Sequence, residues 1–93
     1  MSFDFQEEVF EDVLKDAGER EPKRLIVFND DINTFDHVIN TLVKVCKHSQ
    51  QQAEQCTWII HYKGKCPVKN GSEKKLKPMR DSICDAGIEA QIL

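Results

Sequence analysis

The sequence predicts an α+β fold in which a small sheet of three strands packs on three helices. Three short apolar stretches are typical of strands, and three longer ones have apolar residues at helical spacing. The expected order is β-α-α-β-α-β. It contains no repeated strand-helix-strand unit, which separates it from a parallel α/β fold. At 93 residues, the chain has room for a single core.

The first strand is expected at Lys23–Phe28, where the sequence KRLIVF contains β-branched and aromatic residues. The residues at 29–31, Asn-Asp-Asp, then form a turn. A helix should follow over about residues 34–48, because Asn33 or Thr34 can cap it and apolar residues recur at helical spacing after them.

The second helix begins with a capping-box pattern, since Ser49 is followed three residues later by Gln52. Gly64 is its natural end. The link between the first two helices is so short that they must pack side by side. The inward-facing stripe of the second helix is expected to be Ala53, Cys56, Thr57 and Ile60.

The other two strands are expected on either side of the third helix. The first of them is KCPVK at residues 65–69, where Pro67 must lie at a sheet edge or a bulge because it has no N–H to donate. The second is Ile88–Leu93, in which apolar and polar residues alternate as in a half-buried strand.

The third helix should start after the turn at residues 70–72 and run to about Ala86, with Gly87 as its stop. Pro78 removes a backbone donor, so we expect either a kink there or a fresh helix start with Pro78 in the first turn. The residues at compatible inward spacing are Leu76, Met79, Ile83 and Cys84.

Charge divides the chain into two parts. Residues 1–21 hold eight of the 16 acidic residues, against Lys15 and Arg20 alone. We therefore expect residues 1–22 to be a flexible acidic N-terminal extension and residues 23–93 to be the folded domain.

Composition argues against several classes of protein. The chain is 40% hydrophobic and 31% charged, which is typical of a globular protein. A net charge of −3 does not favour nucleic acid or an anionic membrane surface, and no apolar run reaches the ~20 residues of a membrane span. The four cysteines form no CxxC pair and no secretory signal precedes them, so we expect reduced thiols in a cytoplasmic protein.

Catalysis and metal binding have little support in the sequence. Carboxylates and histidines that could transfer protons are present, but there is no nucleophile elbow, Gly-rich phosphate loop or other catalytic motif. The Cys and His residues do not come in the close pairs of structural zinc sites. We therefore expect neither an enzyme nor a metal or other cofactor.

Two local features suggest a binding site. The turn at residues 29–31 places two carboxylates and an amide together, which costs repulsion unless a cation or backbone amides occupy the site; the alternative is an Asx-turn that caps the following helix. His61 directly follows Ile60 near the end of an apolar helix, and the alternative there is a histidine that interacts with the helix dipole.

Four segments in the same order as in the ClpS family resemble that family, whose members are adaptors that deliver N-degron substrates to the bacterial Clp protease. They are VFNDD at 27–31, TFxxVIxxL at 34–42, AExC at 53–56 and IHYKGK at 60–65. The resemblance covers about residues 23–93. It implies a three-stranded antiparallel sheet packed on three helices, a fold similar to the C-terminal domain of the ribosomal stalk protein.

The resemblance also implies a pocket for the first residue of a polypeptide, with its free α-amine and a bulky side chain such as Leu, Phe, Tyr or Trp. The residues that correspond to the family's amine-binding set are Asn29, Asp30 and His61. Those that correspond to the side-chain pocket, which the family builds from the first two helices and the last strand, are Asp31, Asn33, Phe35, Val38, Thr57, Ile60 and Ile88.

Two of these positions depart from the family pattern. Members commonly carry Met where this chain has Phe35 and Thr57, and the residue at the position of Thr57 acts there as a gate against β-branched side chains. The resemblance further implies a monomer that docks on the N-domain of a ClpA- or ClpC-type AAA+ unfoldase, whose channel receives the N-terminal extension. The alternatives are a small α+β protein interaction domain without the pocket, and an enzyme with an Asp30–His61 dyad.

Overall fold

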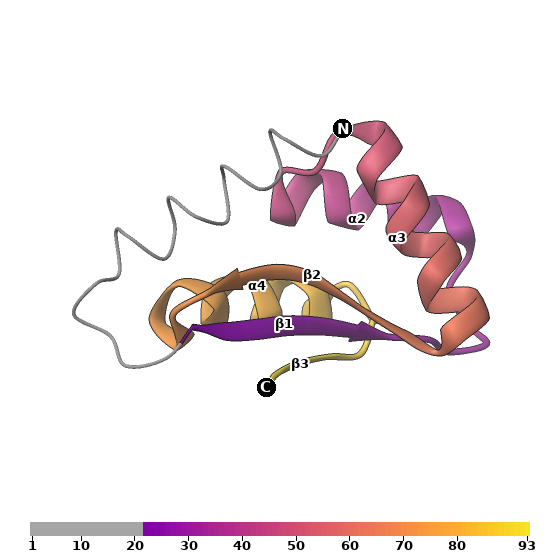
Figure 1. Cartoon of the computed structure of the whole chain (residues 1–93). Coiled ribbons are helices and arrows are strands. Elements are labelled where there is room, and N and C mark those ends of the chain that lie inside the picture. Colours follow the sequence, from indigo (N-terminus) through magenta and orange to yellow (C-terminus); the bar gives the residue numbers. More distant parts are fainter. Residues whose placement is uncertain (1–21) are drawn as a thin grey trace.

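The computed structural model describes residues 22–93 and confirms the predicted order of elements (Figure 1). The expected acidic extension, residues 1–22, lies outside the described residues except for Pro22. The elements are β1 (Lys23–Phe28), α2 (Phe35–Cys46), α3 (Gln50–Lys63), β2 (Lys65–Gly71), α4 (Glu73–Asp85) and β3 (Ala90–Ile92).

The three strands form an antiparallel sheet in the order β2-β1-β3, so that β1 is central (Figure 1). β2 is two residues longer than expected and ends at Gly71 opposite Lys23. Leu25 pairs with Lys69 whereas the next residue of β1 pairs with Pro67, so the register shifts by one residue between these two pairs. Pro67 therefore lies on an edge strand and beside a bulge, as its missing N–H requires.

Local caps explain where the helices begin. The Thr34 hydroxyl accepts a hydrogen bond of 3.1 Å from the backbone N–H of His37 at the start of α2. The predicted capping box of α3 is present in both directions between Ser49 and Gln52. α3 ends as expected at Gly64, which adopts a left-handed conformation with φ of 91°.

α4 is a single helix that starts at Glu73, after the N-cap Ser72, and continues through Pro78. The expected fresh start at Pro78 is therefore wrong. Because the Ser72 cap fixes the start one turn earlier, Pro78 lies in the helix interior, where it has no N–H to offer the carbonyl of Lys74. Cys84 is exposed rather than inward-facing, because its neighbour Ile83 takes the buried position.

β3 is shorter than the predicted strand, and Ile88 precedes it instead of belonging to it. The N–H of Ile88 donates to the carbonyl of Ile83, at 3.2 Å, and the left-handed Gly87 (φ of 87°) turns the chain there. Ile88 is therefore held against the end of α4 and not in the ladder, although it is buried as expected.

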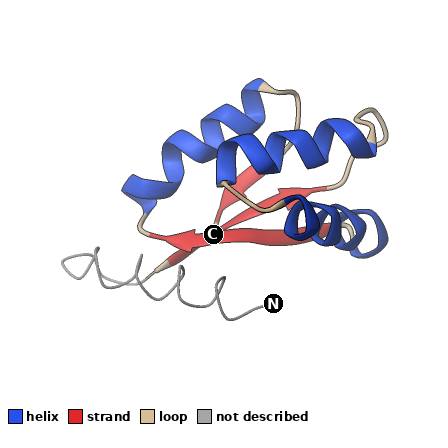
Figure 2. Ribbon diagram, turned by 90° about the horizontal axis from the view of Figure 1, so that it is seen from above, coloured by secondary structure: helices blue, strands red, loops and turns tan. Residues whose placement is uncertain are grey.

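One core joins all six elements. α4 runs behind the strands in Figure 1, and Figure 2 shows the three helices and the sheet from above. Between the helices and the sheet lies one cluster of buried side chains, to which every element contributes. Its members from the six elements include Leu25, Val27, Leu42, Ala53, Ile60, Val68, Leu76, Ile83 and Ala90. Within residues 22–93, no helix is both long and apolar enough to cross a bilayer.

The interior proline makes a prediction about stability. Pro78→Ala restores the N–H donor and removes the steric clash with the preceding turn, so we expect it to stabilise the protein by about 1–3 kcal/mol. Chemical denaturation measures this change. Lys77→Ala is the matched control, because its exposed ion pair with Asp81, at 3.4 Å, contributes only about 0.5 kcal/mol. A Pro78→Ala variant less stable than the parent would contradict this reading of α4.

Candidate functional site

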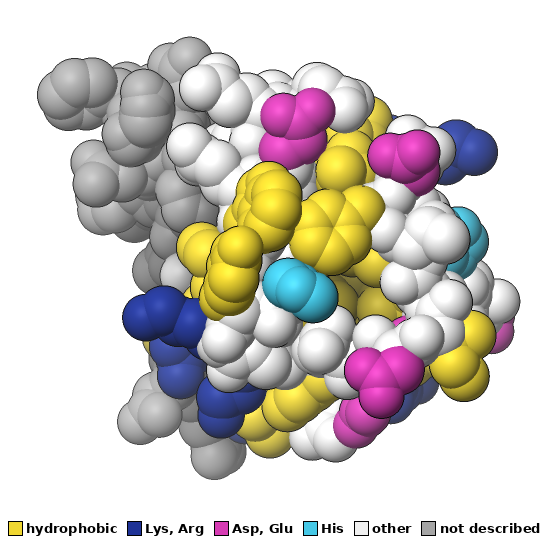
Figure 3. Space-filling view, turned by 90° about the vertical axis from the view of Figure 1, so that its right-hand side faces the viewer, with side chains coloured by type: hydrophobic (Ala, Val, Ile, Leu, Met, Phe, Trp, Pro, Cys, Tyr) yellow, Lys and Arg dark blue, Asp and Glu magenta, His cyan; other side chains and the backbone are white. Residues whose placement is uncertain are grey.

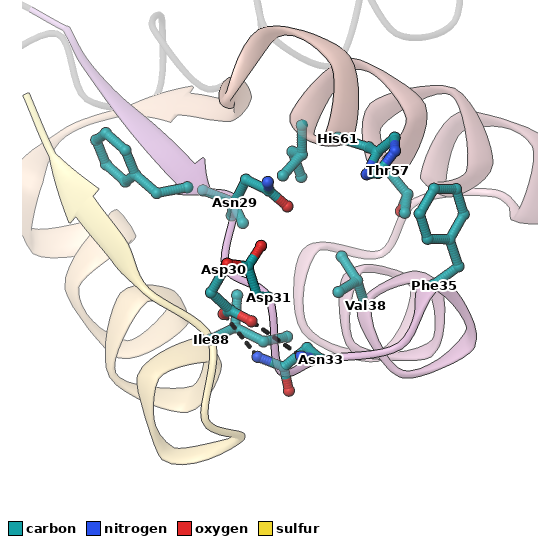
Figure 4. A pocket seen from close by; sticks show the side chains of 12 residues that line it. Asn29, Asp30, Asp31, Asn33, Phe35, Val38, Thr57, His61 and Ile88 are labelled. Carbon is teal, nitrogen blue, oxygen red and sulfur yellow. Dashed lines mark hydrogen bonds between the residues drawn. The ribbon is translucent and has the colours of Figure 1, made fainter.

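A cavity of about 230 Å³ lies where the end of β1, the start of α2 and the end of α3 meet (Figure 4). It is lined by Val27, Phe28, Asn29, Asp30, Asp31, Asn33, Phe35, Val38, Thr57, Ile60, His61 and Ile88. The structure thus brings all ten residues that the sequence singled out around one cavity.

The cavity has a polar mouth and an apolar base. Asn29, Asp31 and His61 are exposed at its mouth. Five lining residues are at most 8% exposed, and they are Val27, Val38, Thr57, Ile60 and Ile88. In Figure 3, hydrophobic side chains gather around the hollow on this face. The arrangement suits a ligand with one charged or polar end and one apolar end.

A backbone hydrogen bond brings the first strand to the end of α3. The N–H of Asn29 donates to the carbonyl of Gly64 at 2.9 Å. His61 is one turn before Gly64 on α3, so this contact places Asn29 and His61 on the same side of the mouth. The His61 ring also packs edge-on against Phe35 of α2, with 5.2 Å between the ring centroids.

The loop at 30–33 is built around the carboxylate of Asp30. Its Oδ1 accepts from the backbone N–H groups of Ile32 and Asn33, both at 2.9 Å, and its Oδ2 accepts from Nδ2 of Asn33 at 2.7 Å (Figure 4). The hydrogen bond from the backbone of Asn33 is the main cause that lowers the pKa of Asp30 below its ordinary value of 3.8. Asp30 is therefore ionised at neutral pH.

These hydrogen bonds, two of which come from backbone amides, offset the repulsion expected between the carboxylates of the turn. The Asx-turn considered from the sequence is present, although the N-cap of α2 is Thr34. Asp30 can still accept a further hydrogen bond, because a carboxylate has about four lone-pair directions and three hydrogen bonds are formed within the turn. Its negative charge also remains at the cavity wall.

Asn33 links this loop to the segment that carries Ile88. Besides its bond to Asp30, Nδ2 of Asn33 donates to the carbonyl of Gly87 at 2.8 Å. Nε2 of His37 is 2.8 Å from the carbonyl of Ala86. The side chains of Asn33 and His37 thus hold the turn after α4. This turn places Ile88 at the base of the cavity. The side-chain amide of Asn33 positions the cavity wall through its hydrogen bonds to Asp30 and to the carbonyl of Gly87.

Thr57 lines the cavity, and its hydroxyl donor is already used within α3. Its hydroxyl donates to the carbonyl of Ala53, one turn earlier on α3, at 2.7 Å. Because the hydroxyl hydrogen is used within the helix, Thr57 has no donor left for a ligand, and its oxygen can only accept a hydrogen bond. Phe35 forms a second wall and is held by an edge-to-face contact with Trp58, with 4.9 Å between centroids.

Two lining residues, Val27 and Phe28, were not among the predicted site residues. Both belong to β1, and Val27 is fully buried. Their positions in the strand signalled only a core role, although both fall within the VFNDD segment. Among residues 22–93, no group of three or more His, Cys, Asp or Glu side chains is placed to hold a metal ion.

The network around Asp30 predicts a pH-dependent contribution to stability. Because the pKa of Asp30 is lowered on folding, its ionised form stabilises the fold above pH 3.8, and this contribution disappears as the pH falls through the lowered value. Asp30→Asn should therefore destabilise the protein at neutral pH, by about 1 kcal/mol or less after solvent screening. Its difference from the parent should shrink below pH 3.8.

Chemical denaturation of the parent and the Asp30→Asn variant across this pH range measures the difference. A gap in unfolding free energy that stays constant down to the lowest pH would show that ionised Asp30 does not support the loop.

Three comparisons place the chain among known proteins. A family model described as ATP-dependent Clp protease adaptor protein ClpS matches residues 19–91. The ATP-dependent Clp protease adapter protein ClpS of Thermosynechococcus vestitus is 32% identical over 66 residues, which are 70% of this chain and 70% of that relative.

A solved structure of Agrobacterium tumefaciens ClpS2 bound to L-phenylalaninamide has the same fold, with a TM-score of 0.69 and 20% identity, over 81% of this chain and 98% of that one. The family match confirms the resemblance in the sequence and extends over most of the described domain. This chain therefore belongs to the ClpS family, the adaptors of the ATP-dependent Clp protease.

Proposed function

We propose that this ClpS-family adaptor binds the first residue of N-degron polypeptides and delivers them to a Clp AAA+ protease. It would hold the free α-amine together with a bulky hydrophobic side chain of Leu, Phe, Tyr or Trp. The observation that carries this proposal is the cavity, which combines a polar mouth and a buried apolar base in one space of about 230 Å³.

The mouth has the right groups for an ammonium. An α-ammonium has three donors, and the acceptors around it would be the amide oxygen of Asn29, the Asp30 carboxylate and a neutral ring nitrogen of His61. The lowered pKa of Asp30 keeps that carboxylate charged. At an effective dielectric of 20, such an ion pair is worth about 4 kcal/mol before desolvation. A blocked or internal amide nitrogen lacks this attraction.

The base has the right size for one side chain. A cavity of about 150 Å³ accommodates a benzene ring, and this one has about 230 Å³. It is smaller than the roughly 300–1,000 Å³ typical of sites for larger ligands. The A. tumefaciens relative was solved with L-phenylalaninamide, and an aromatic amino acid derivative is the ligand class that this cavity suits.

The rest of the proposal rests on the family. The partners would be N-degron substrates and the N-domain of a ClpA- or ClpC-type unfoldase, with the adaptor acting as a cytoplasmic monomer and residues 23–93 as its binding unit. Neither a nucleic acid nor a membrane would be a partner. Within the described residues, the cavity disfavours the alternative of a plain interaction domain, which has no need of a polar mouth over an apolar base.

The first test compares labelled peptides that differ only at residue one, by fluorescence anisotropy. Peptides that begin with Phe or Leu should bind, and N-acetylation of the Phe peptide should weaken binding at least about tenfold, since the charge-assisted contacts are lost. Ile and Val peptides report whether the short Thr57 still excludes β-branched side chains.

Asn29→Ala should weaken binding of the Phe peptide in the same assay, whereas the matched control Asn40→Ala, at an exposed position of α2 outside the cavity lining, should not. Equal binding of free and acetylated Phe peptides would contradict an amine site, and no binding by any peptide would favour the interaction domain.

A further inference from the structure

Two large aromatic side chains of α3 lie exposed beside the cavity. Trp58 is 49% and Tyr62 73% exposed. Their rings stack at 5.3 Å between centroids, with 13° between the ring planes. We call this pair the aromatic shelf. Residues four apart on a helix are neighbours, so α3 itself brings these two rings together.

The shelf is continuous with the cavity wall. Phe35 and His61 both line the cavity, and both contact the shelf. The Phe35 ring meets the Trp58 ring edge-on at 4.9 Å, and the His61 ring lies 5.3 Å from Tyr62 and 6.3 Å from Trp58. An apolar surface therefore runs from the mouth onto the outer face of α3, where Figure 3 shows hydrophobic side chains around the hollow.

We propose that the aromatic shelf binds the side chain of the second residue of a peptide whose first residue occupies the cavity. This inference rests on the proposed function and extends it to a second position. Successive Cα atoms of a peptide are 3.80 Å apart, so a chain whose amine is beside His61 has its second residue within reach of rings about 5–6 Å from that histidine.

The shelf favours an apolar or aromatic second residue. Both rings are already held, Trp58 by Phe35 and Tyr62 by its stack on Trp58. A side chain that packs on them therefore orders little of the protein and loses less entropy than it would on flexible side chains. Glycine offers no side chain for this contact, and a carboxylate would lose hydration against the rings.

The area of the shelf fits one side chain better than a protein partner. A large aromatic residue buries about 150–250 Å² when fully covered, and these two are partly covered already. A stable interface between two proteins needs about 800 Å² from each. A second copy of this chain, or another folded protein, would need more apolar surface than the shelf itself supplies.

The test uses the full chain and peptides with Phe at residue one and Gly, Ala, Leu, Phe or Glu at residue two. Leu or Phe at that position should bind about threefold to tenfold more tightly than Gly, the range expected for one added aromatic contact. Trp58 is the only tryptophan of the chain. Its fluorescence should therefore change more with the Phe-Phe peptide than with the Phe-Gly peptide.

The decisive quantity is the ratio of the affinity for the Phe-Phe peptide to the affinity for the Phe-Gly peptide. In Trp58→Ala and in Tyr62→Ala, the preference for Phe over Gly at residue two should fall toward one, whatever the absolute affinity. Tyr62 is so exposed that its removal should leave the fold intact. Ile59→Ala is the matched control, because Ile59 is an exposed apolar residue of α3 outside the cavity lining, and it should leave the ratio unchanged.

The remaining outcomes separate a failure of the aromatic shelf from a failure of the proposed function. Equal binding of the Gly and Phe peptides by the parent would overturn the shelf and leave the proposed function standing. No binding of any peptide with Phe at residue one would instead defeat the proposed function. A preference found at residue three alone, or a dimer that Trp58→Ala dissociates in sedimentation, would give the shelf another occupant and overturn its assignment to residue two.

Discussion

The hydrogen bonds of Asp30 and Asn33 are the constraint on which the site depends. Asp30 shapes the loop between β1 and α2, and Asn33 joins that loop to Gly87 beyond α4. Two stretches more than 50 residues apart in sequence are thereby fixed to one another. This link acts together with the hydrogen bond from the N–H of Ile88 to the carbonyl of Ile83, and both hold Ile88 at the apolar base of the cavity.

The same arrangement separates two tasks in the cavity. Charge and hydrogen bonding are confined to the mouth, where Asp30 is ionised and Asn29 and His61 are exposed. The base consists of apolar side chains and of Thr57, whose hydroxyl donor is used by its own helix. Under the proposed function, the mouth selects a chain terminus and the base selects the side chain, so each can vary without the other. Phe35 forms a wall of the cavity and also contacts the exposed ring of Trp58 on α3.

Local chemistry explains which parts of the fold were predictable from the sequence. The capping box at Ser49 and Gln52 acts within one turn, so it fixed the start of α3 correctly. The start of α4 was ambiguous because Pro78 suits a first turn, and only the Ser72 cap decided between the two choices. The place of Ile88 before β3 depends on contacts with Asn33 and α4, which no local pattern contains. The lining of the cavity was predicted by family resemblance, since spacing alone does not bring distant segments together.

The central claim is that the cavity receives an amino acid with a free amine. Its most direct measurement is an NMR titration of the ¹⁵N-labelled protein with L-phenylalaninamide, with N-acetyl-L-phenylalaninamide as the comparison ligand. The account predicts saturable shifts at Asn29, Asn33, Thr57, His61 and Ile88 with the first ligand, and much weaker shifts with the second. Absence of these shifts with L-phenylalaninamide, or equal shifts with both ligands, would contradict it.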